Sequence, residues 1–177
     1  FRAVTSDYTD SGFDRGHLCP SDDRDGSFED NNATFLMTNI VPQAPNHNRE
    51  LWADLEAYCR KVAEAGNELY IVAGVYGTGG SGSNGGRTKT LAKGKITVPE
   101  SLWKVVVILP TGSNDISRIN ESTRVEGTKW GEYRLSVDDL EDLTGYDFMS
   151  NVPKDIQKIL ERRKDDGPTI KVSSMRQ

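Results

Sequence analysis

The stretch that decides the fold begins with FDRGHLCP at residues 13–20 and ends at residue 60. It contains His17, one of two histidines in the chain. Residues 34–41 read TFLMTNIV, and such a run of β-branched, aromatic and aliphatic residues is typical of a β-strand. We therefore expect one strand at 13–18, an Asp-rich loop at 21–32 and a second strand at 34–41. Gly16 inside the first strand predicts a close backbone approach beside the histidine.

An amphipathic helix is expected over residues 48–66. Apolar residues recur there at intervals of three and four, and Gly66 is a stop signal. Side chains four residues apart share one face of a regular α-helix, which would align Asn48, Trp52, Glu56 and Arg60. Such a row is either a solvated face, because Glu–Arg pairs at this spacing are ordinary helix chemistry, or part of a site.

Three motifs in order carry a family resemblance: DRGHLCP at 14–20, TNIVPQ at 38–43 and the row from Asn48 to Arg60. Together they resemble the DNA/RNA non-specific endonuclease family, to which mitochondrial endonuclease G belongs. Further similarity at 68–74, 98–106 and 143–148 extends the resemblance to about residue 153. The resemblance implies an α+β fold, in which a mainly antiparallel sheet is layered with helices and carries a ββα-metal, or His-Me finger, active site.

The resemblance also implies hydrolysis of phosphodiester bonds in DNA and RNA, single- or double-stranded. His17 would be the general base, a role that suits a neutral imidazole near pH 7. Its other ring nitrogen would be held by a backbone carbonyl on the strand containing Phe35. Asn48 would be the one direct protein ligand of a Mg²⁺ ion, for which Mn²⁺ or another divalent ion can substitute. Mg²⁺ dehydrates reluctantly and takes few protein ligands.

The resemblance assigns roles to the remaining site residues too. Glu56 would hold and orient metal-bound water, and Asn39 would be a further active-site amide. Arg15 and Arg60 would neutralise charge that builds on the phosphate. Chemistry confined to phosphate and metal reads neither base edges nor the 2′-hydroxyl, which is a physical reason for acting on both nucleic acids.

The overall charge of the chain does not favour nucleic-acid binding. The net charge is −5 and the isoelectric point is about 5.1, the opposite of the basic footprint of most nucleic-acid binders. Contact with DNA or RNA would then depend on a local cluster and the metal, with affinity that falls as salt rises. No apolar run approaches the roughly 20 residues that a membrane helix needs, so no membrane partner is expected.

By size, residues 1–177 are expected to form a single nuclease domain. The family places another arginine upstream of the histidine motif, and Arg2 does not match it clearly. We therefore expect the chain to lack the N-terminal segment of the family. Two alternatives follow: a nucleic-acid-binding module that is inactive without that segment, or the nuclease warhead of a larger toxin that meets a protein inhibitor.

The two cysteines leave two interpretations open. Cys19 and Cys59 could form a disulfide that clamps the finger to the helix, or remain buried free thiols. A disulfide, together with the habit of the family, favours a secreted or periplasmic protein. An organelle is the alternative location.

The rest of the chain predicts further elements. Residues 69–75 are expected to form a buried strand, and residues 77–86 (GTGGSGSNGG) a flexible linker. Residues 102–109 (LWKVVVIL) predict a central strand with Trp103 in the core. A helix led by Ser136 is expected at 137–144, with an acidic face in solvent. We also expect strands at 95–98, 122–126, 132–135 and 169–172, and a helix at 155–163.

Overall fold

The computed structural model describes residues 1–110, 118–119 and 130–165. The chain divides into two compact units. The first combines Phe1–Ala53 with Gly74–Leu102, and the second combines Asp54–Ala73 with the described part of Trp103–Gln177.

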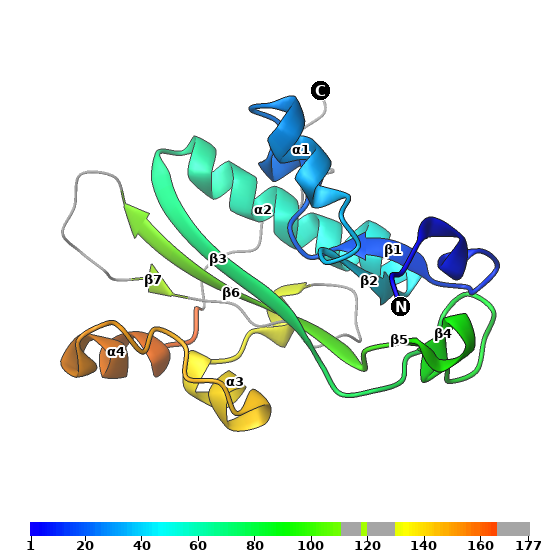
Figure 1. Cartoon of the computed structure of the whole chain (residues 1–177). Coiled ribbons are helices and arrows are strands. Elements are labelled where there is room, and N and C mark those ends of the chain that lie inside the picture. Colours follow the sequence, from blue (N-terminus) through cyan, green and yellow to red (C-terminus); the bar gives the residue numbers. More distant parts are fainter. Residues whose placement is uncertain (111–117, 120–129, 166–177) are drawn as a thin grey trace. The chain divides into compact units, whose positions relative to one another are not determined.

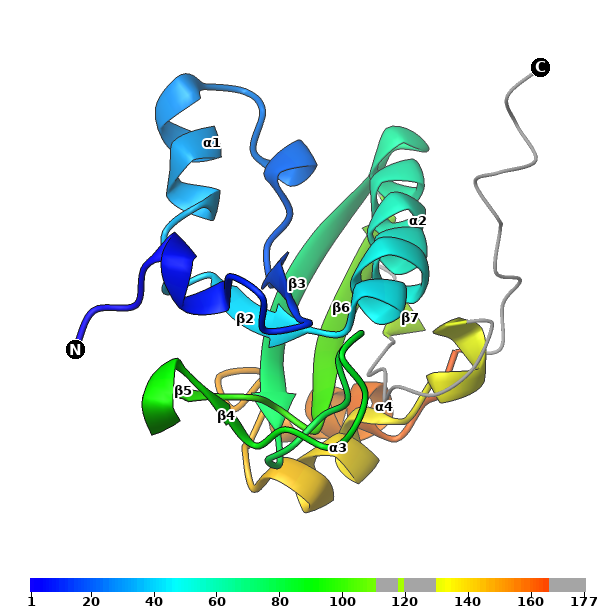
Figure 2. The same ribbon diagram turned by 90° about the vertical axis from the view of Figure 1, so that its right-hand side faces the viewer.

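The first unit is built around a two-stranded antiparallel pair. β1 (Asp14–His17) pairs with β2 (Ile40–Gln43), with Asp14 opposite Gln43 and His17 opposite Ile40. A 3₁₀ turn η1 (Thr5–Tyr8) precedes β1, and the connection to β2 contains a second turn, η2 (Ser21–Asp23), and the helix α1 (Phe28–Thr34). In the view of Figure 2, α1 lies above β2. A π-helical segment, η3 (His47–Trp52), follows β2.

The core of the first unit forms where these elements meet a small second hairpin. That hairpin consists of β4 (Thr90–Leu91), the turn η4 (Ala92–Gly94) and β5 (Ile96–Thr97). Burying a large apolar side chain contributes roughly 1.5–3 kcal/mol, so a small cluster suffices to hold the pair in place. The buried members are Tyr8, Phe13, Ile40, Leu91 and Val98.

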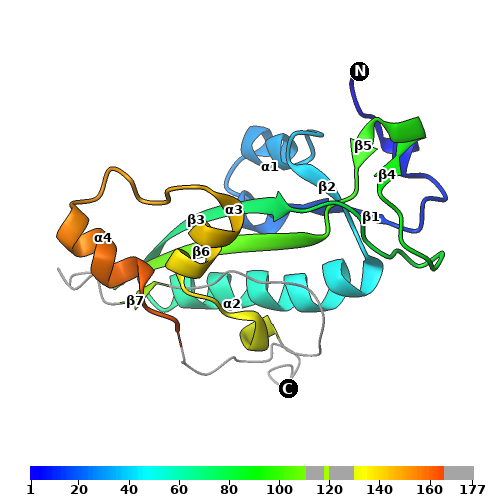
Figure 3. The same cartoon turned by 90° about the horizontal axis from the view of Figure 1, so that it is seen from below.

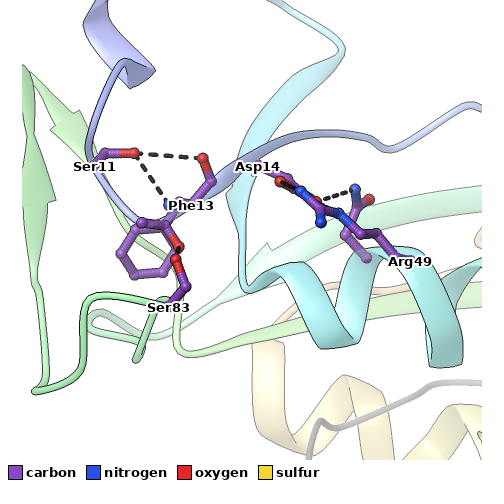
Figure 4. A network of polar contacts seen from close by, with 7 residues as sticks. Ser11, Phe13, Asp14, Arg49 and Ser83 are labelled. Atoms are coloured by element: carbon purple, nitrogen blue, oxygen red, sulfur yellow. Dashed lines mark hydrogen bonds and ion pairs between the residues drawn. The ribbon is translucent and has the colours of Figure 1, made fainter.

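The glycine-rich stretch at 77–86 packs into the first unit, and the expectation of a flexible linker was wrong. The backbone N–H of Ser83 donates to the carbonyl oxygen of Gly12 at 2.8 Å, and Gly80 bridges Thr88. A Cβ on Gly82 would collide with the Gly12 carbonyl. Glycine is therefore needed for a close approach of two backbones. Figure 4 shows Ser83 beside Phe13.

Most of a three-stranded sheet lies in the second unit, with helices on both faces. The strand order is β3 (Asn67–Tyr76), β6 (Ser101–Pro110) and β7 (Arg118–Ile119), so β6 is central, as predicted. The helices are α2 (Ala53–Glu64), α3 (Val137–Thr144) and α4 (Lys154–Glu161), with a 3₁₀ turn η5 (Trp130–Tyr133). Figure 3 shows α2 running along β3 and β6. In Figure 1, α2 lies on one side of these strands, and α3 and α4 lie on the other.

The alternation of side chains along β6 explains why helices pack on both faces of the sheet. Trp103 and Val105 point into a core with Val137, Leu140 and Leu160 of the two C-terminal helices. Lys104 lies between them in sequence and therefore faces the opposite side. Its Nζ lies 3.6 Å from Glu56 of α2. The expected central strand and the core position of Trp103 are both confirmed.

The C-terminal helices begin close to where the sequence predicts. Ser136 Oγ accepts from the backbone N–H of Asp139 at 3.0 Å, and the Asp139 carboxylate accepts from the N–H of Ser136. This capping box fixes the start of α3, and Gly145 in the left-handed conformation ends it. Helix α4 begins at Lys154, one residue before the predicted start.

Several predicted elements differ in the structure. The connection at 21–32 holds α1, because Ser27 Oγ caps that helix by accepting from Asp30 N at 3.0 Å. Helix α1 ends at Thr34, so the second strand begins only at Ile40. Residues 130–133 form the turn η5, so the strand expected at 132–135 was wrong. The strands expected at 122–126 and 169–172 lie outside the described residues.

Strand β3 is present, but it is not buried. Tyr70 is 55% exposed and Val72 is 53% exposed. A continuous apolar run suggested a strand covered on both faces. Within the described strands, however, β3 lies at the edge of its sheet, next to β6 alone.

The described helices include none long and apolar enough to cross a membrane.

Candidate active site

Strand β1 presents two sets of side chains to opposite faces. Arg15 and His17 alternate with Asp14 and Gly16, as the period of a strand requires. The His17 side chain is half-buried, and its Nε2 is closed to solvent without a hydrogen-bond partner among the described residues. The ring of Phe35 meets the imidazole edge-on, with 5.0 Å between ring centroids.

The imidazole of His17 is held in its neutral form. Burial lowers the pKa of His17, and the positive charge of Arg15 lowers it further. Both causes disfavour the imidazolium, because one removes water from the charge and the other repels it. A neutral imidazole near pH 7 can accept a proton.

The backbone of His17 is fixed from two sides. Trp52 Nε1 donates a hydrogen bond to the His17 carbonyl oxygen at 3.1 Å, and Gln43 Nε2 donates to the same oxygen at 3.4 Å. Gln43 reaches this position because residue 16 is glycine: a Cβ there would overlap the Gln43 side chain. The close approach predicted beside the histidine is therefore confirmed.

The amide of Asn48 has a defined orientation. Asn48 Nδ2 donates to Asp14 Oδ2 at 3.0 Å, and Arg49 donates to both carboxylate oxygens of Asp14 at 2.8 and 2.7 Å. Figure 4 shows Asp14 and Arg49 joined in this way. An ionised carboxylate only accepts, so the NH₂ group of Asn48 must face Asp14 and Oδ1 must face away. No hydrogen bond within the described residues uses that Oδ1.

Asp14 is a residue of the candidate site that sequence patterns did not reveal. Burial raises the pKa of Asp14, but hydrogen bonds from Arg49 and Asn48 and the charge of Arg49 outweigh burial and lower it overall. Asp14 is therefore ionised at neutral pH and can hold the Asn48 amide. The sequence signal for a role of Asp14 is its position. It lies two residues before Gly16 in the strand, on the face opposite His17.

The orientation of Asn48 fits the metal that the sequence implies. A carboxamide oxygen that is not engaged by protein donors is a hard, neutral ligand of the kind that Mg²⁺ and Ca²⁺ accept. One such oxygen matches an ion that keeps most of its water. The residues present are therefore suitable for a divalent cation at Asn48.

The row predicted along the helix is interrupted. Its first two members, Asn48 and Trp52, lie in the π-helical segment, where hydrogen bonds run from i to i+5 and the spacing of four no longer aligns side chains. Trp52 is 1% exposed and contacts His17, whereas Asn48 contacts Asp14. Regular α-helix begins at Ala53. The single straight row was therefore wrong for this part of the helix.

Glu56 and Arg60 belong to the second unit. Glu56 forms an ion pair with Lys104, whose side chain is 1% exposed. A charge this buried is tolerated only with a partner, so the pair fixes Glu56 in place. The sequence signal for this ion pair is Lys104, a lysine inside the otherwise apolar run 102–109.

Asn39 acts on backbone groups. Its Nδ2 donates to the carbonyl oxygens of Cys19 at 2.7 Å and Thr34 at 2.8 Å, and its Oδ1 accepts from Cys19 N at 2.9 Å. These bonds tie the segment after His17 to the end of α1. Asn39 thus stabilises the connection between β1 and β2.

The structure answers two further expectations, on Phe35 and on the cysteines, and it also locates His47. Phe35 caps the end of α1 and is not on a strand, and no hydrogen bond within the described residues joins the His17 ring to a carbonyl oxygen. Cys19 and Cys59 are not joined in a disulfide: Cys59 is buried and Cys19 is half-buried. His47 is buried in the first turn of η3, where burial lowers its pKa to about 4.

Comparisons with known proteins identify the class. Residues 1–155 match the family described as DNA/RNA non-specific endonuclease. A protein named Nuclease from a Nostoc species is 47% identical over 174 residues, which cover 93% of this chain and 60% of the relative. Nuclease EXOG, mitochondrial, from Xenopus laevis is 30% identical over 164 residues, which cover 88% of this chain and 46% of the relative.

A solved structure of an EndoG/EndoGI complex shares the fold, with a TM-score of 0.64 and 20% identity over 86% of this chain and 65% of that chain. The antiparallel strands and helices thus form an α+β nuclease fold, as expected. With the match over residues 1–155, the chain belongs to the DNA/RNA non-specific endonuclease family. It spans 60% of the length of the Nostoc relative and 46% of the Xenopus relative.

Proposed function

We propose that this chain is an endonuclease that hydrolyses phosphodiester bonds of DNA and RNA, with His17 as general base and one Mg²⁺ held by Asn48. Membership of the DNA/RNA non-specific endonuclease family supports nuclease chemistry. The observation that carries the finer proposal is the Asp14–Asn48 hydrogen bond, which leaves a carboxamide oxygen for a cation in the unit that holds a neutral histidine.

His17 would take the proton from the attacking water. Its Nε2 is closed to solvent, which leaves Nδ1 as the ring nitrogen that an incoming water can reach. The lowered pKa keeps this nitrogen unprotonated at neutral pH, as a general base requires. The bonds from Trp52 and Gln43 to the His17 carbonyl would hold the imidazole in position during proton transfer.

The reaction also requires that negative charge on the phosphate oxygens be stabilised. A bound Mg²⁺ would supply Lewis-acid stabilisation of the phosphate oxygens. Arg15 is exposed next to His17 on β1, where its guanidinium can approach a phosphate. We further propose that Glu56 orients water bound to the metal and that Arg60 neutralises phosphate charge. The net charge of −5 makes such local cations necessary for substrate binding.

The proposed partners are single- and double-stranded DNA and RNA. The residues assigned here act on phosphate and water, and none is assigned to a base edge. Cleavage should therefore show little sequence preference and little preference for sugar. A protein inhibitor is a further proposed partner, because the structurally similar EndoG is seen in an EndoG/EndoGI complex.

The deciding experiment is digestion of plasmid DNA and of total RNA by the purified chain, with Mg²⁺ and with EDTA. The His17→Ala variant should lose most activity but bind nucleic acid nearly as well as the wild type. Asn48→Ala should need more Mg²⁺ for the same rate, whereas Asn46→Ala, an exposed amide two residues earlier, should behave as the wild type.

Three results would count against the proposal. Full cleavage by His17→Ala would remove the general-base assignment. An unchanged Mg²⁺ titration of Asn48→Ala would move the metal ligand elsewhere. A folded chain that binds DNA but cleaves neither substrate would favour the alternative of a nucleic-acid-binding module.

A further inference from the structure

Three carboxylates converge between α3 and α4. Asp138 and Glu141 lie three residues apart on α3, and Glu161 is in the last turn of α4. One carboxylate oxygen of each residue lies within 4.8 Å of the others. Residues three apart share a helix face, and the two helices lie beside each other in Figure 1. Asp138, Asp139 and Asp142 are exposed, as expected for a solvated acidic face, whereas Glu141 is half-buried.

Glu161 is an unusual member of this cluster because it is buried. It is only 5% exposed, and its Oε1 has no hydrogen-bond partner among the described residues. Burying an ionised carboxylate without compensation is costly, so such groups are normally paired or bound to a metal. Within the described residues, no lysine or arginine forms an ion pair with any of the three carboxylates.

The remaining groups around the cluster do not neutralise it. Glu141 Oε1 accepts from the backbone N–H of Phe148 at 2.6 Å, which fixes that carboxylate but adds no positive charge. Burial raises the pKa of Glu161, the Gln157 side chain opposes this, and the charges of Glu141, Asp138 and Asp147 raise it again. Four acidic groups thus lie close enough to repel one another at this place, and the charge of Lys154 opposes this repulsion at Glu141.

We propose that Asp138, Glu141 and Glu161 form a calcium-binding site that fastens α3 to α4. The donors are all carboxylate oxygens from two helices, and Ca²⁺ accepts six to eight oxygens in flexible geometry. Zinc is disfavoured because the cluster has no histidine or cysteine. This site shares no residue with the proposed active site, so its role is structural.

The proposal is tested with the whole chain after removal of metal by a chelator. Calcium at saturation should raise the melting temperature of the wild type by roughly 5 °C or more. Glu161→Gln should abolish this calcium-induced rise, and Asp138→Asn should weaken it. Asp142→Asn removes an exposed carboxylate from the same helix and should leave the rise intact. Asn48→Ala should also retain it, which separates this site from the proposed catalytic metal.

Terbium luminescence gives a second readout. Trp103, Tyr146 and Phe148 form an aromatic cluster, and Phe148 bonds to Glu141, so bound Tb³⁺ should be sensitised in the wild type and not in Glu161→Gln. The proposal fails if calcium does not stabilise the wild type. It also fails if Glu161→Gln keeps the full response, or if stability depends on pH and not on calcium, because the carboxyl groups would then share a proton.

Discussion

The indole Nε1 of Trp52 donates a hydrogen bond to the backbone carbonyl oxygen of His17 at 3.1 Å. This bond joins the helical segment that carries Asn48 to the strand that carries the proposed base. Trp52 lies in the π-helical segment, so this irregular turn brings the buried indole N–H within hydrogen-bond distance of the His17 carbonyl oxygen. π-helical turns are frequent at functional sites, and here the turn has a defined partner.

Removing the indole N–H should therefore impair catalysis. Trp52→Phe keeps most of the buried ring but leaves the His17 carbonyl with only the longer bond from Gln43. We expect a loss of about 1–3 kcal/mol in stability and a fall in kcat of about 10-fold, because small displacements of a catalytic group are costly. Trp130→Phe changes a buried tryptophan of the second unit and should lower stability without lowering kcat. Equal kcat for Trp52→Phe and the wild type would show that the bond is only structural.

A substitution at Gly16 tests the second hydrogen bond to the His17 carbonyl oxygen, the one that Gln43 donates. A methyl group at position 16 would overlap Gln43, so Gly16→Ala should displace that side chain and cost about 1–3 kcal/mol of unfolding free energy. A Cβ on Gly26 meets nothing within 4 Å, so Gly26→Ala is the matched control and should be nearly neutral. Urea denaturation measures both. Similar midpoints for the two variants would mean that Gln43 moves away at no cost.

Part of the local structure around the proposed site could be predicted from the sequence because it depends on short motifs. The helix after Asn48, the central strand β6 and the capped helix α3 were all predicted. These elements have strong local signals: a β-branched run, periodic apolar residues and a capping box. Local signals are retained when tertiary contacts agree with them.

What the sequence did not reveal depends on contacts between distant residues. The carboxylate of Asp14 acquires its role only when β1 lies next to η3, a separation of 34 residues. The glycines at 77–86 look like a linker until Gly12 is brought against Gly82. The exposure of β3 follows from its position at the edge of the sheet, which composition does not encode. The π-helical turn has no composition signal of its own.

The ion pair and hydrogen bond of Asp14 lead to a prediction about metal use. Asp14→Ala removes the acceptor that orients the Asn48 amide, so the amide can turn its NH₂ group toward the cation site. We expect the Mg²⁺ concentration for half-maximal rate to rise about 10-fold, which corresponds to about 1.4 kcal/mol. Arg49→Gln keeps Asp14 in place and removes only a solvent-exposed guanidinium, so the Mg²⁺ requirement should change little. Metal titrations of cleavage rate distinguish the two, and matching curves for Asp14→Ala and the wild type would contradict the orienting role.

Burial of His47 predicts an acid-sensitive fold. Its pKa is lowered to about 4, whereas the unfolded chain should titrate near the ordinary value of 6.5. Below pH 6.5 the unfolded state binds the proton first, so stability falls as pH decreases from 6.5 to about 4. The loss should amount to roughly 3 kcal/mol. Denaturation curves at a series of pH values measure it, and His47→Gln should flatten the dependence over this range. A wild type with constant stability between pH 7 and 4.5 would contradict the neutral buried state.

The last prediction concerns the acid limb of the rate profile. If His17 is the general base, kcat/KM rises with pH until His17 has lost its proton and then reaches a plateau. The pKa of His17 is lowered by burial and by Arg15, so the limb should lie below the ordinary histidine value. Arg15→Gln removes the repelling charge but not the burial, so it should move the limb to higher pH and lower the plateau as well. Arg15→Lys keeps the charge, and its limb should stay close to that of the wild type even if the plateau falls. A limb that does not move in Arg15→Gln would mean that a group other than His17 controls the rate.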